Sequence, residues 1–460
     1  DIDGSVANPP DRPVRPRFRL WYRPASPMLP LHDVLPPSAT VTPEGHLAVG
    51  GCDLVALAEE HGTPLVVYDE AAIRAAARAY LDAMARHAPG GEVVYASKAY
   101  YGQGVLRALC EEGLSVDAAS GGELYAALRA GFPPERIHMH GNNKDARELG
   151  EALDARVGTV VVDGLDEITL LERLAAERGV VQRVLLRLAP GVNPDTHAHI
   201  ATGQLDTKFG FPLVGGIAEA GIAAVRASPH LRLEGVHAHL GSQLYDLSVF
   251  AEAAEVLAAF VAGLGGEDIG TVDIGGGLGI AYTAHDRPPA IADFCEAVST
   301  AVFEAWNRHG LAAPRIVVEP GRSVVGRAGV VLYRVGGVKE IPGVRTYVSV
   351  DGGMSDLLRP ALYGAVYEPL LANRAQDEPA GRFRVVGKHC ESGDVLVADA
   401  HLPHPEVGDV VCLPAAGAYG VTMASNYNGQ PRPAVLFVGD GRARVVTRRE
   451  TYADIIARDT

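Results

Sequence analysis

The chain has 460 residues, of which 47% are hydrophobic and 21% charged, and its formal net charge is −15 at pH 7. This is the composition of a globular protein with room for two or three domains, and the negative charge argues against nucleic acid as the main partner. No apolar run approaches the twenty residues of a transmembrane helix, and the N-terminus lacks a basic-then-apolar signal pattern.

The cysteines and histidines point away from a metal centre. Cys52, Cys110, Cys295, Cys390 and Cys412 are far apart and form no Cys-x-x-Cys pair, which favours reduced thiols in a cytoplasm. His237 and His239 could be a metal pair, but no further ligand cluster lies near them in the sequence. We therefore predict no metal site.

The N-terminal region predicts a leader followed by a short mixed segment. Residues 1–28 hold several prolines and arginines with little apolar periodicity, so we expect a mobile leader there. Residues 29–64 are expected to contribute to a later β domain, through an extended stretch near 46–55. Pro64–Asp69 is predicted to be a strand and Ala71–His87 an amphipathic helix.

A regular alternation of strands and helices then begins. The predicted strands are 92–98, 114–119, 136–141, 159–163, 183–189, 233–240, 270–275 and 315–319. Most of the gaps hold amphipathic helix patterns; one begins at Ser120 with a capping-box pattern to Glu123 and stops before Gly131. Eight such strands predict a (β/α)8 barrel over residues 65–322, with a doubly wound open sheet as the competing fold.

Polar residues follow the end of each predicted strand, where a barrel gathers its active site. In strand order they are Lys98, Asp117, His140, Asp163, Arg187, His239 with Gly241 and Ser242, Gly275–Gly277, and Glu319–Arg322. Any one of them could be an incidental polar group at a strand end. Together they predict a functional face.

Beyond residue 322 the alternation stops. Short strand patterns follow one another without long helices, and Gly439-Asp440-Gly441 is typical of a hairpin turn. We expect an all-β domain, a sandwich or barrel, over residues 323–460.

Three motifs carry chemistry. Lys98 follows the apolar run Val93–Tyr95 in a chain with only five lysines; burial would lower its pKa and free an amine for Schiff-base chemistry, whereas a plain surface lysine is the alternative. Gly275-Gly276-Gly277 offers bare amides to an anion, or is simply a turn. Glu319-Pro-Gly-Arg322 is either a tight turn or a carboxylate facing a ring nitrogen. A lysine, an anion cradle and a carboxylate together match the aldehyde, phosphate and pyridine nitrogen of pyridoxal 5′-phosphate.

Five motifs in order make a family resemblance specific. Tyr95-Ala-Ser-Lys-Ala, His239-x-Gly-Ser-Gln, Gly275-Gly-Gly-Leu-Gly, Glu319-Pro-Gly-Arg and His389-Cys-Glu-Ser-Gly-Asp all occur. From about residue 45 to the C-terminus the chain resembles the diaminopimelate decarboxylases, within the barrel-type pyridoxal-phosphate decarboxylases that include ornithine and arginine decarboxylases. The leader at 1–28 has no counterpart in this resemblance.

The resemblance implies roles for residues at matching positions. Lys98 would bind the cofactor covalently, His239 would stack on its ring, and Glu319 would pair with the ring nitrogen. The phosphate would be surrounded by Ser242, Gly275, Gly276, Gly277, Gly321, Arg322 and Tyr419. We add Asp117, which ends the second strand, to the cofactor-binding candidates.

For the substrate, the resemblance implies carboxylate binding by Arg322, Arg359, Tyr363 and Tyr419. Cys390 would return a proton after CO₂ leaves, and Glu391 would bind the distal ammonium group. In the family these two residues come from a partner chain, so a homodimer is implied; a surface cysteine is the alternative for Cys390.

The function that we expect is decarboxylation of meso-diaminopimelate to L-lysine and CO₂ in the cytoplasm. One alternative is a sister decarboxylase acting on ornithine, arginine or another modified amino acid. A second is a cofactor-free barrel that binds and regulates a partner, whose mark would be the loss of Lys98 or of the glycine loop. Both features are present.

Overall fold

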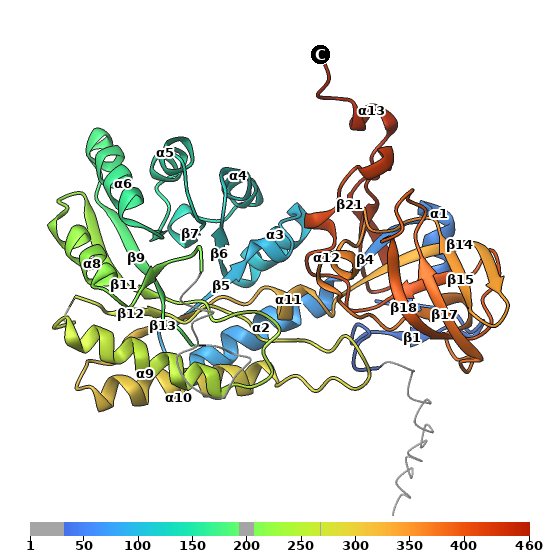
Figure 1. The fold of residues 1–460 in the computed structure, drawn as a ribbon, viewed down its shortest axis with the longest axis horizontal. Coiled ribbons are helices and arrows are strands. Elements are labelled where there is room, and N and C mark those ends of the chain that lie inside the picture. Colours follow the sequence, from blue (N-terminus) through green and yellow to red (C-terminus); the bar gives the residue numbers. More distant parts are fainter. Residues whose placement is uncertain (1–31, 193–206, 267) are drawn as a thin grey trace, which may run out of the picture.

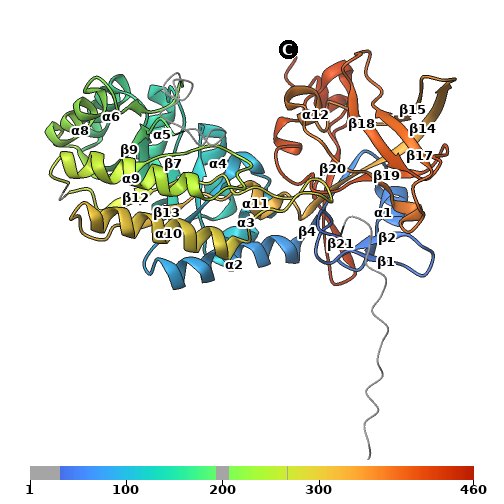
Figure 2. The ribbon, with the colours of Figure 1, turned by 60° about the horizontal axis from the view of Figure 1, so that its bottom comes forward.

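The molecule consists of an α/β barrel and a β-rich domain placed side by side (Figures 1 and 2). The structure is a computed structural model and describes residues 32–192, 207–266 and 268–460. The leader expected over 1–28 lies outside the described residues.

Eight parallel strands form the barrel, and each overlaps one of the runs predicted from the sequence, with β9 and β11 beginning one and two residues earlier than predicted. They are β5 (Glu92–Ala96), β6 (Ser115–Ala118), β7 (Ile137–Met139), β8 (Thr159–Val162), β9 (Gln182–Ala189), β11 (Leu231–His237), β12 (Thr271–Asp273) and β13 (Arg315–Val318). Each pairs with its neighbours in this order, and β13 pairs with β5, so the sheet closes on itself. The predicted barrel is confirmed, and the doubly wound alternative is wrong because an open sheet would have two free edges.

Helices cover the outside of the barrel. They are α2 (Glu70–His87), α3 (Gln103–Glu112), α4 (Gly121–Ala130), α5 (Ala146–Ala155), α6 (Leu165–Arg178), α8 (Ile217–Ala227), α9 (Ser248–Gly263) and α10 (Ile291–Arg308). Helix α2 shows why: Ile73, Ala77, Tyr80 and Met84 recur at helical spacing and are buried on its inner face.

Capping residues fix where these helices begin and end. The Ser120 side chain accepts a hydrogen bond from the Glu123 amide, and α4 ends at Gly131, whose φ is 97°. The capping box predicted here is only half formed, because the Glu123 carboxylate accepts from the Ala119 amide and not from that of Ser120. Helix α5 has the complete box, between Asp145 and Glu148.

The second domain is built from antiparallel and mixed strands. Its main sheet runs β18 (Val395–Leu402), β17 (Gly381–Val386), β15 (Arg345–Val350), β14 (Gly329–Ile341), β4 (Leu65–Asp69), β20 (Ala434–Gly439) and β21 (Arg442–Thr447). Off this path, β19 (Val410–Leu413) pairs with β14, and β16 (Leu370–Leu371) pairs with β19. The predicted hairpin joins β20 to β21, and Asp440 and Gly441 both have positive φ, as its two-residue turn requires. Short α-helices α11 (Arg322–Val325), α12 (Arg359–Tyr363) and α13 (Tyr452–Ile455) and 3-10 turns at Ala372–Arg374, Val421–Met423 and Tyr427–Gly429 lie between or after these strands.

Strand β4 belongs to the sheet of this second domain, although the expected boundary places residue 65 onward in the barrel. It pairs antiparallel with β14 and parallel with β20, and it leads directly into α2, whose N-cap is Asp69. The pattern Leu-Val-Val-Tyr gives a strand but does not say which sheet it joins. The chain therefore starts the barrel from inside the β domain.

The N-terminal segment packs on the outer face of this sheet, as Figures 1 and 2 show. Strands β1 (Thr40–Val41), β2 (Leu47–Val49) and β3 (Cys52–Asp53) form a small sheet of their own, followed by α1 (Leu54–His61). Leu47 and Leu54 are buried with Leu65 and Val330 in a second hydrophobic core. The stretch near 46–55 thus joins the β domain through side chains and not by extending its main sheet.

Strands β4 and β14 divide their side chains between two cores. On β4, Val66 and Tyr68 belong to the large core shared with the barrel, and Leu65 and Val67 belong to the second core. This alternation follows from the two-residue period of a strand.

No helix among the described residues is both long and apolar enough to cross a membrane.

Candidate active site

The carboxyl ends of the barrel strands open into a cavity of about 590 Å³. Its polar lining includes Lys98, Asp117, His140, Arg187, His237, His239, Ser242 and Glu319. A smaller cavity of about 50 Å³ adjoins it through Lys98, His239, Ser242 and Glu319, and is closed by Gly277, Gly321, Arg322 and Tyr419. Asp163 is the strand-end residue that turns away: it accepts hydrogen bonds from Gly210 N (2.9 Å) and Asn142 Nδ2 (2.7 Å).

Lys98 lies in a short 3-10 turn, Ser97–Ala99, directly after β5. The turn is fixed from two sides, because Ser97 N donates to Asp117 Oδ1 (2.7 Å) and Tyr419 N of the β domain donates to Ala99 O (2.8 Å). The Lys98 side chain is exposed and lines both cavities. Of the two environments considered for this lysine from the sequence, the described chain shows the exposed one, at the strand end where the pattern placed it.

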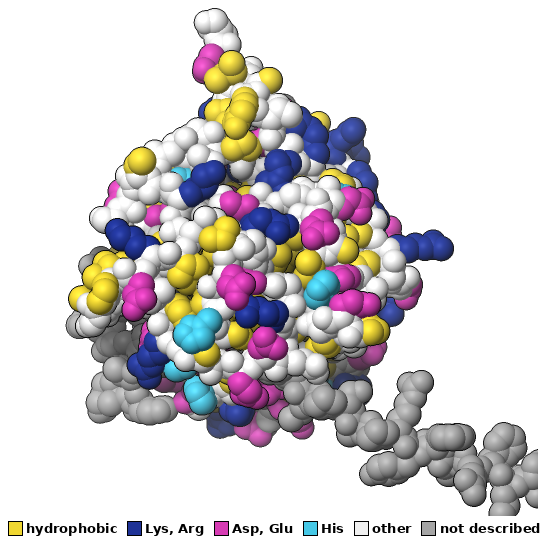
Figure 3. All heavy atoms as spheres, turned by 90° about the vertical axis from the view of Figure 1, so that its right-hand side faces the viewer, with side chains coloured by type: hydrophobic (Ala, Val, Ile, Leu, Met, Phe, Trp, Pro, Cys, Tyr) yellow, Lys and Arg dark blue, Asp and Glu magenta, His cyan; other side chains and the backbone are white. Residues whose placement is uncertain are grey.

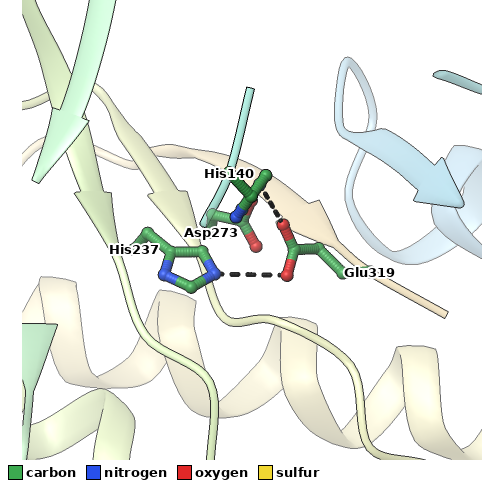
Figure 4. A group of neighbouring side chains, drawn as sticks. All are labelled: His140, His237, Asp273 and Glu319. Carbon is green, nitrogen blue, oxygen red and sulfur yellow. Dashed lines mark hydrogen bonds and ion pairs between the residues drawn. The ribbon is translucent and has the colours of Figure 1, made fainter. Parts of the chain in front are cut away.

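Glu319 lies beneath the cavity in a cluster of four buried side chains (Figure 4). Glu319 Oε1 lies 2.8 Å from His140 Nε2, and Glu319 Oε2 lies 3.2 Å from His237 Nε2. Burial alone would raise the pKa of Glu319, but the two imidazoles hold it well below its usual range. Asp273, the fourth member, accepts from Gly275 N (2.9 Å), and burial together with the Glu319 charge raises its pKa.

The donor atoms of this cluster lie within 4.8 Å of one another, a spacing that a metal ion could also bridge. Each oxygen of Glu319 already faces an imidazole nitrogen, so we interpret the cluster as a set of polar contacts. The pair that we considered from the sequence, His237 with His239, is split: His239 is not a member. Its Nδ1 instead faces Gly276 N at 3.3 Å, and burial lowers its pKa to about 3.

The guanidinium of Arg322 and the hydroxyls of Ser242 and Tyr419 line the smaller cavity. Arg322 Nη2 donates to Ser242 Oγ (2.8 Å), its Nη1 donates to Tyr282 Oη, and its guanidinium lies 4.9 Å from the centre of the Tyr419 ring. Arg322 Nε is buried without a hydrogen-bond partner among the described residues. This arrangement suits an anion such as a phosphate.

The three glycines are used differently from the prediction of three free amides. Gly275 N donates to Asp273 Oδ1, and Gly276 N donates to His239 Nδ1. Only Gly277 of the three lines either cavity, and a Cβ there would lie 2.7 Å from Gly241 O. The glycines therefore also permit close backbone packing beneath the site.

The substrate residues implied by the resemblance divide into two groups. Arg359 is buried, donates to Tyr367 Oη (2.6 Å) and stacks on Tyr282, the same ring that Arg322 contacts. Tyr363, by contrast, is 66% exposed. Cys390 and Glu391 are exposed, and neither lines the barrel cavity of the described chain.

Sequence reasoning missed several neighbours of the site. It noted His140 and His237 without linking them to Glu319, and it missed Tyr282 and Asn428 altogether. Asn428 Oδ1 accepts from Cys390 N (3.1 Å) and lies 3.3 Å from His389 Nδ1. The position of His140 at a strand end was an available signal. Tyr282 lies in a loop and Asn428 in a short 3-10 turn, Tyr427–Gly429, and neither had such a signal.

Known proteins resemble about nine tenths of this chain. A family model described as "Pyridoxal-dependent decarboxylase, pyridoxal binding domain" matches residues 70–326. The diaminopimelate decarboxylase of Bacillus subtilis is 48% identical over 90% of this chain and 95% of its own, and that of Mycobacterium bovis is 45% identical over 92% and 97%.

This chain belongs to the diaminopimelate decarboxylase family. Solved structures agree. Diaminopimelate decarboxylase from M. jannaschii in complex with L-lysine has a TM-score of 0.86 and 35% identity, covering 92% of this chain and 98% of that one. The Helicobacter pylori enzyme, also with L-lysine, has a TM-score of 0.78 and 31% identity, covering 88% and 99%. The protein is thus a pyridoxal-phosphate-dependent amino-acid decarboxylase, and the cofactor-free barrel is not favoured.

The residues present fit the cofactor of this decarboxylase. The Lys98 amine is exposed to both cavities, Glu319 lines both, and the smaller cavity is surrounded by Ser242, Arg322 and Tyr419. The unpartnered Arg322 Nε and the close glycine packing leave room for an anion and not for further side chains. The cavities therefore present an amine for the aldehyde of the cofactor, an anion site for its phosphate and a carboxylate for its ring nitrogen.

Proposed function

We propose that this enzyme converts meso-diaminopimelate to L-lysine and CO₂. The relatives and solved neighbours that support this are named for diaminopimelate. The observation that carries it is the pair of buried arginines, Arg322 and Arg359, which share the ring of Tyr282; Arg322 also lines the smaller cavity with Lys98 and Glu319. Two permanent cations suit a substrate with two carboxylates better than an amine-tailed amino acid.

The cofactor and this chain divide the work. Pyridoxal phosphate, when bound, supplies an aldehyde for the substrate amine and a sink for the electrons that CO₂ leaves behind. Lys98 would hold the group covalently, Ser242, Gly277, Gly321, Arg322 and Tyr419 would surround its phosphate, and His239, Glu319 and Asp117 would lie around its ring. Arg322 and Arg359 orient the substrate carboxylates, with Tyr363 and Tyr419 beside them.

A second copy of the chain completes the site in this proposal. Cys390 returns a proton to the carbon that has lost CO₂, and Glu391 binds the distal ammonium group, both from the partner. Two observations support it: both residues are exposed, and the ring of Tyr427, itself 42% exposed, lies 5.4 Å from that of His389, the neighbour of Cys390. Water-exposed apolar groups of this kind favour a protein contact.

We place the enzyme in the cytoplasm. All five cysteines are free, and a reducing compartment keeps them so.

Seen from the side of the β domain, basic and acidic side chains are interspersed on the surface (Figure 3).

Steady-state kinetics with a panel of substrates tests the reaction. We expect kcat/KM for meso-diaminopimelate to exceed that for ornithine, arginine and lysine by at least about 1,000-fold, because an amine tail leaves a buried arginine without its carboxylate. A preference for ornithine or arginine would overturn the assignment in favour of a sister decarboxylase.

Lys98→Ala should abolish turnover and remove the visible absorbance that borohydride bleaches in the wild-type protein, because the amine has no substitute at that turn. Lys339→Ala, at an exposed position on β14, is the matched control and should leave both unchanged. Absorbance spectra and CO₂ release measure the two effects. Wild-type turnover in Lys98→Ala would remove this lysine from the mechanism.

A further inference from the structure

Two imidazoles flank Glu319, one for each of its carboxylate oxygens (Figure 4). We propose that His140 and His237 are positioning residues that hold Glu319 as a fixed anion, each through its Nε2–H, in the orientation that it presents to the cofactor ring. The inference rests on the proposed role of Glu319 as the partner of the ring nitrogen.

The geometry comes from three separate strands of the barrel. His140 follows β7, His237 ends β11 and Glu319 follows β13, so the two rings reach the carboxylate from different sides. His237 Nε2 makes a hydrogen bond of 3.2 Å with Glu319 Oε2, whereas His140 Nε2 lies 2.8 Å from Glu319 Oε1, at hydrogen-bond distance but without hydrogen-bond alignment. The rings also pack edge to face, with centroids 5.1 Å apart. A carboxylate held at both oxygens cannot rotate freely, much as outer partners orient the ligands of a metal.

The protonation states are consistent with two neutral donors and one anion. Burial lowers the pKa of His140 to about 4 and also lowers that of His237, so each ring carries one proton at neutral pH. That proton belongs on Nε2, which faces the carboxylate. His237 Nδ1 is buried without a partner among the described residues, as fits a lone pair better than an N–H.

Asp273 takes the other protonation state. Burial and the charge of Glu319 raise its pKa, and its Oδ2 is buried without a hydrogen-bond partner in the described chain. Of the two carboxyl groups, Glu319 therefore carries the charge. The titratable groups that face Glu319 are His140, His237, Asp273 and, across the cavity, Asp117, Lys98 and His239.

Variants of the two histidines separate a donor role from simple packing. Gln places an amide N–H close to the position of Nε2, Asn does not reach it, and Leu removes the donor. Apo-protein of each variant is titrated with pyridoxal phosphate, and the pH midpoint of the visible absorbance is measured on the reconstituted enzyme. His138→Leu is the matched control, because His138 is also a buried histidine beside a carboxylate, Glu92, and lines neither cavity.

We expect His140→Leu and His237→Leu to weaken cofactor binding by about 10-fold or more, the range for a lost hydrogen bond to a charged group, and Gln to restore most of it. Without its donors Glu319 becomes a stronger base, so it protonates at higher pH and the absorbance midpoint moves up. His138→Leu should change neither readout.

Wild-type affinity and midpoint in folded Leu variants would overturn the inference. Should the Leu variants fail to fold, the comparison of Gln with Asn decides, and equal behaviour of the two overturns it. Glu319→Gln is measured in parallel: unchanged cofactor affinity there removes the proposed role of Glu319 itself, whereas a loss there with normal histidine variants removes only the histidine inference.

Discussion

Asp117 shows how strongly the barrel acts on a single residue. Its side chain is 5% exposed, Oδ1 accepts the Ser97 amide, and burial together with the charge of Glu319 raises its pKa to about 8. The folded protein therefore disfavours the ionised form that the unfolded chain adopts above its ordinary pKa of about 4. Between these two values the unfolded chain binds fewer protons than the folded one, so this residue lowers stability as pH rises.

Asp117→Asn should remove that penalty while keeping the oxygen that accepts from Ser97. We expect the apo-protein variant to be more stable than wild type at pH 7, by at most about 4 kcal/mol, with the gain shrinking toward pH 4. Thermal unfolding across this pH range measures it. A gain that is the same at every pH would show that titration of Asp117 is not its cause.

For single residues, the sequence predicted which residues lie at the site better than it predicted their exposure and hydrogen-bond partners. Lys98, Glu319 and Arg322 lie where their motifs placed them, because each motif follows a strand whose end is set by local pattern. The exposure of Lys98 and the internal use of the Gly275 and Gly276 amides depend on Asp273, His239 and the β domain, which are distant in the sequence. Tertiary neighbours decide such properties.

At the scale of elements, the turn around Asn428 supports the segment that carries Cys390. Asn428 has a φ of 52°, and its Oδ1 accepts from Cys390 N and lies within reach of His389 Nδ1. His389 Nε2 lies 2.9 Å from Ser355 Oγ, which ties the segment to the buried interior. One amide oxygen thus supports two consecutive residues.

Asn428→Ala should lower kcat by about 10-fold, because losing a shared acceptor frees the Cys390 segment, while cofactor affinity stays near wild type. Asn428→Asp keeps the acceptor and should retain most of the rate. Single-turnover kinetics and a pyridoxal phosphate titration separate the two effects. An Ala variant as fast as the Asp variant would exclude this support from the mechanism.

The local sequence pattern predicted some elements fully and others only in part. The Asp440-Gly441 turn was predictable because its positive φ angles need those residue types. The membership of β4 was not, since Leu-Val-Val-Tyr satisfies a strand in either domain and only pairing with β14 and β20 decides.

The proposed homodimer can be tested on the whole molecule. Lys98→Ala and Cys390→Ala each remove one half of a shared site. If the halves come from different chains, a random mixture of the two variants should recover about 25% of wild-type activity, because half of the dimers are mixed and each has one intact site. Light scattering checks the assembly; a mixture no more active than its parents would contradict the shared site.

Sequence patterns could not place Cys390 in space, because its role depends on a surface between copies and not on any strand. The family motif supplied the residue, and its exposure in the described chain is what a single copy should show if the proposal holds.

Because β4 packs into a hydrophobic core on each of its two faces, the barrel and the β domain should unfold together. Because alternate side chains of one five-residue strand are embedded in different hydrophobic interiors, neither half can melt and leave the other's interior intact. Heat should therefore produce one calorimetric transition, and swapping the β half for one from another protein would require redesigning this strand on both its faces.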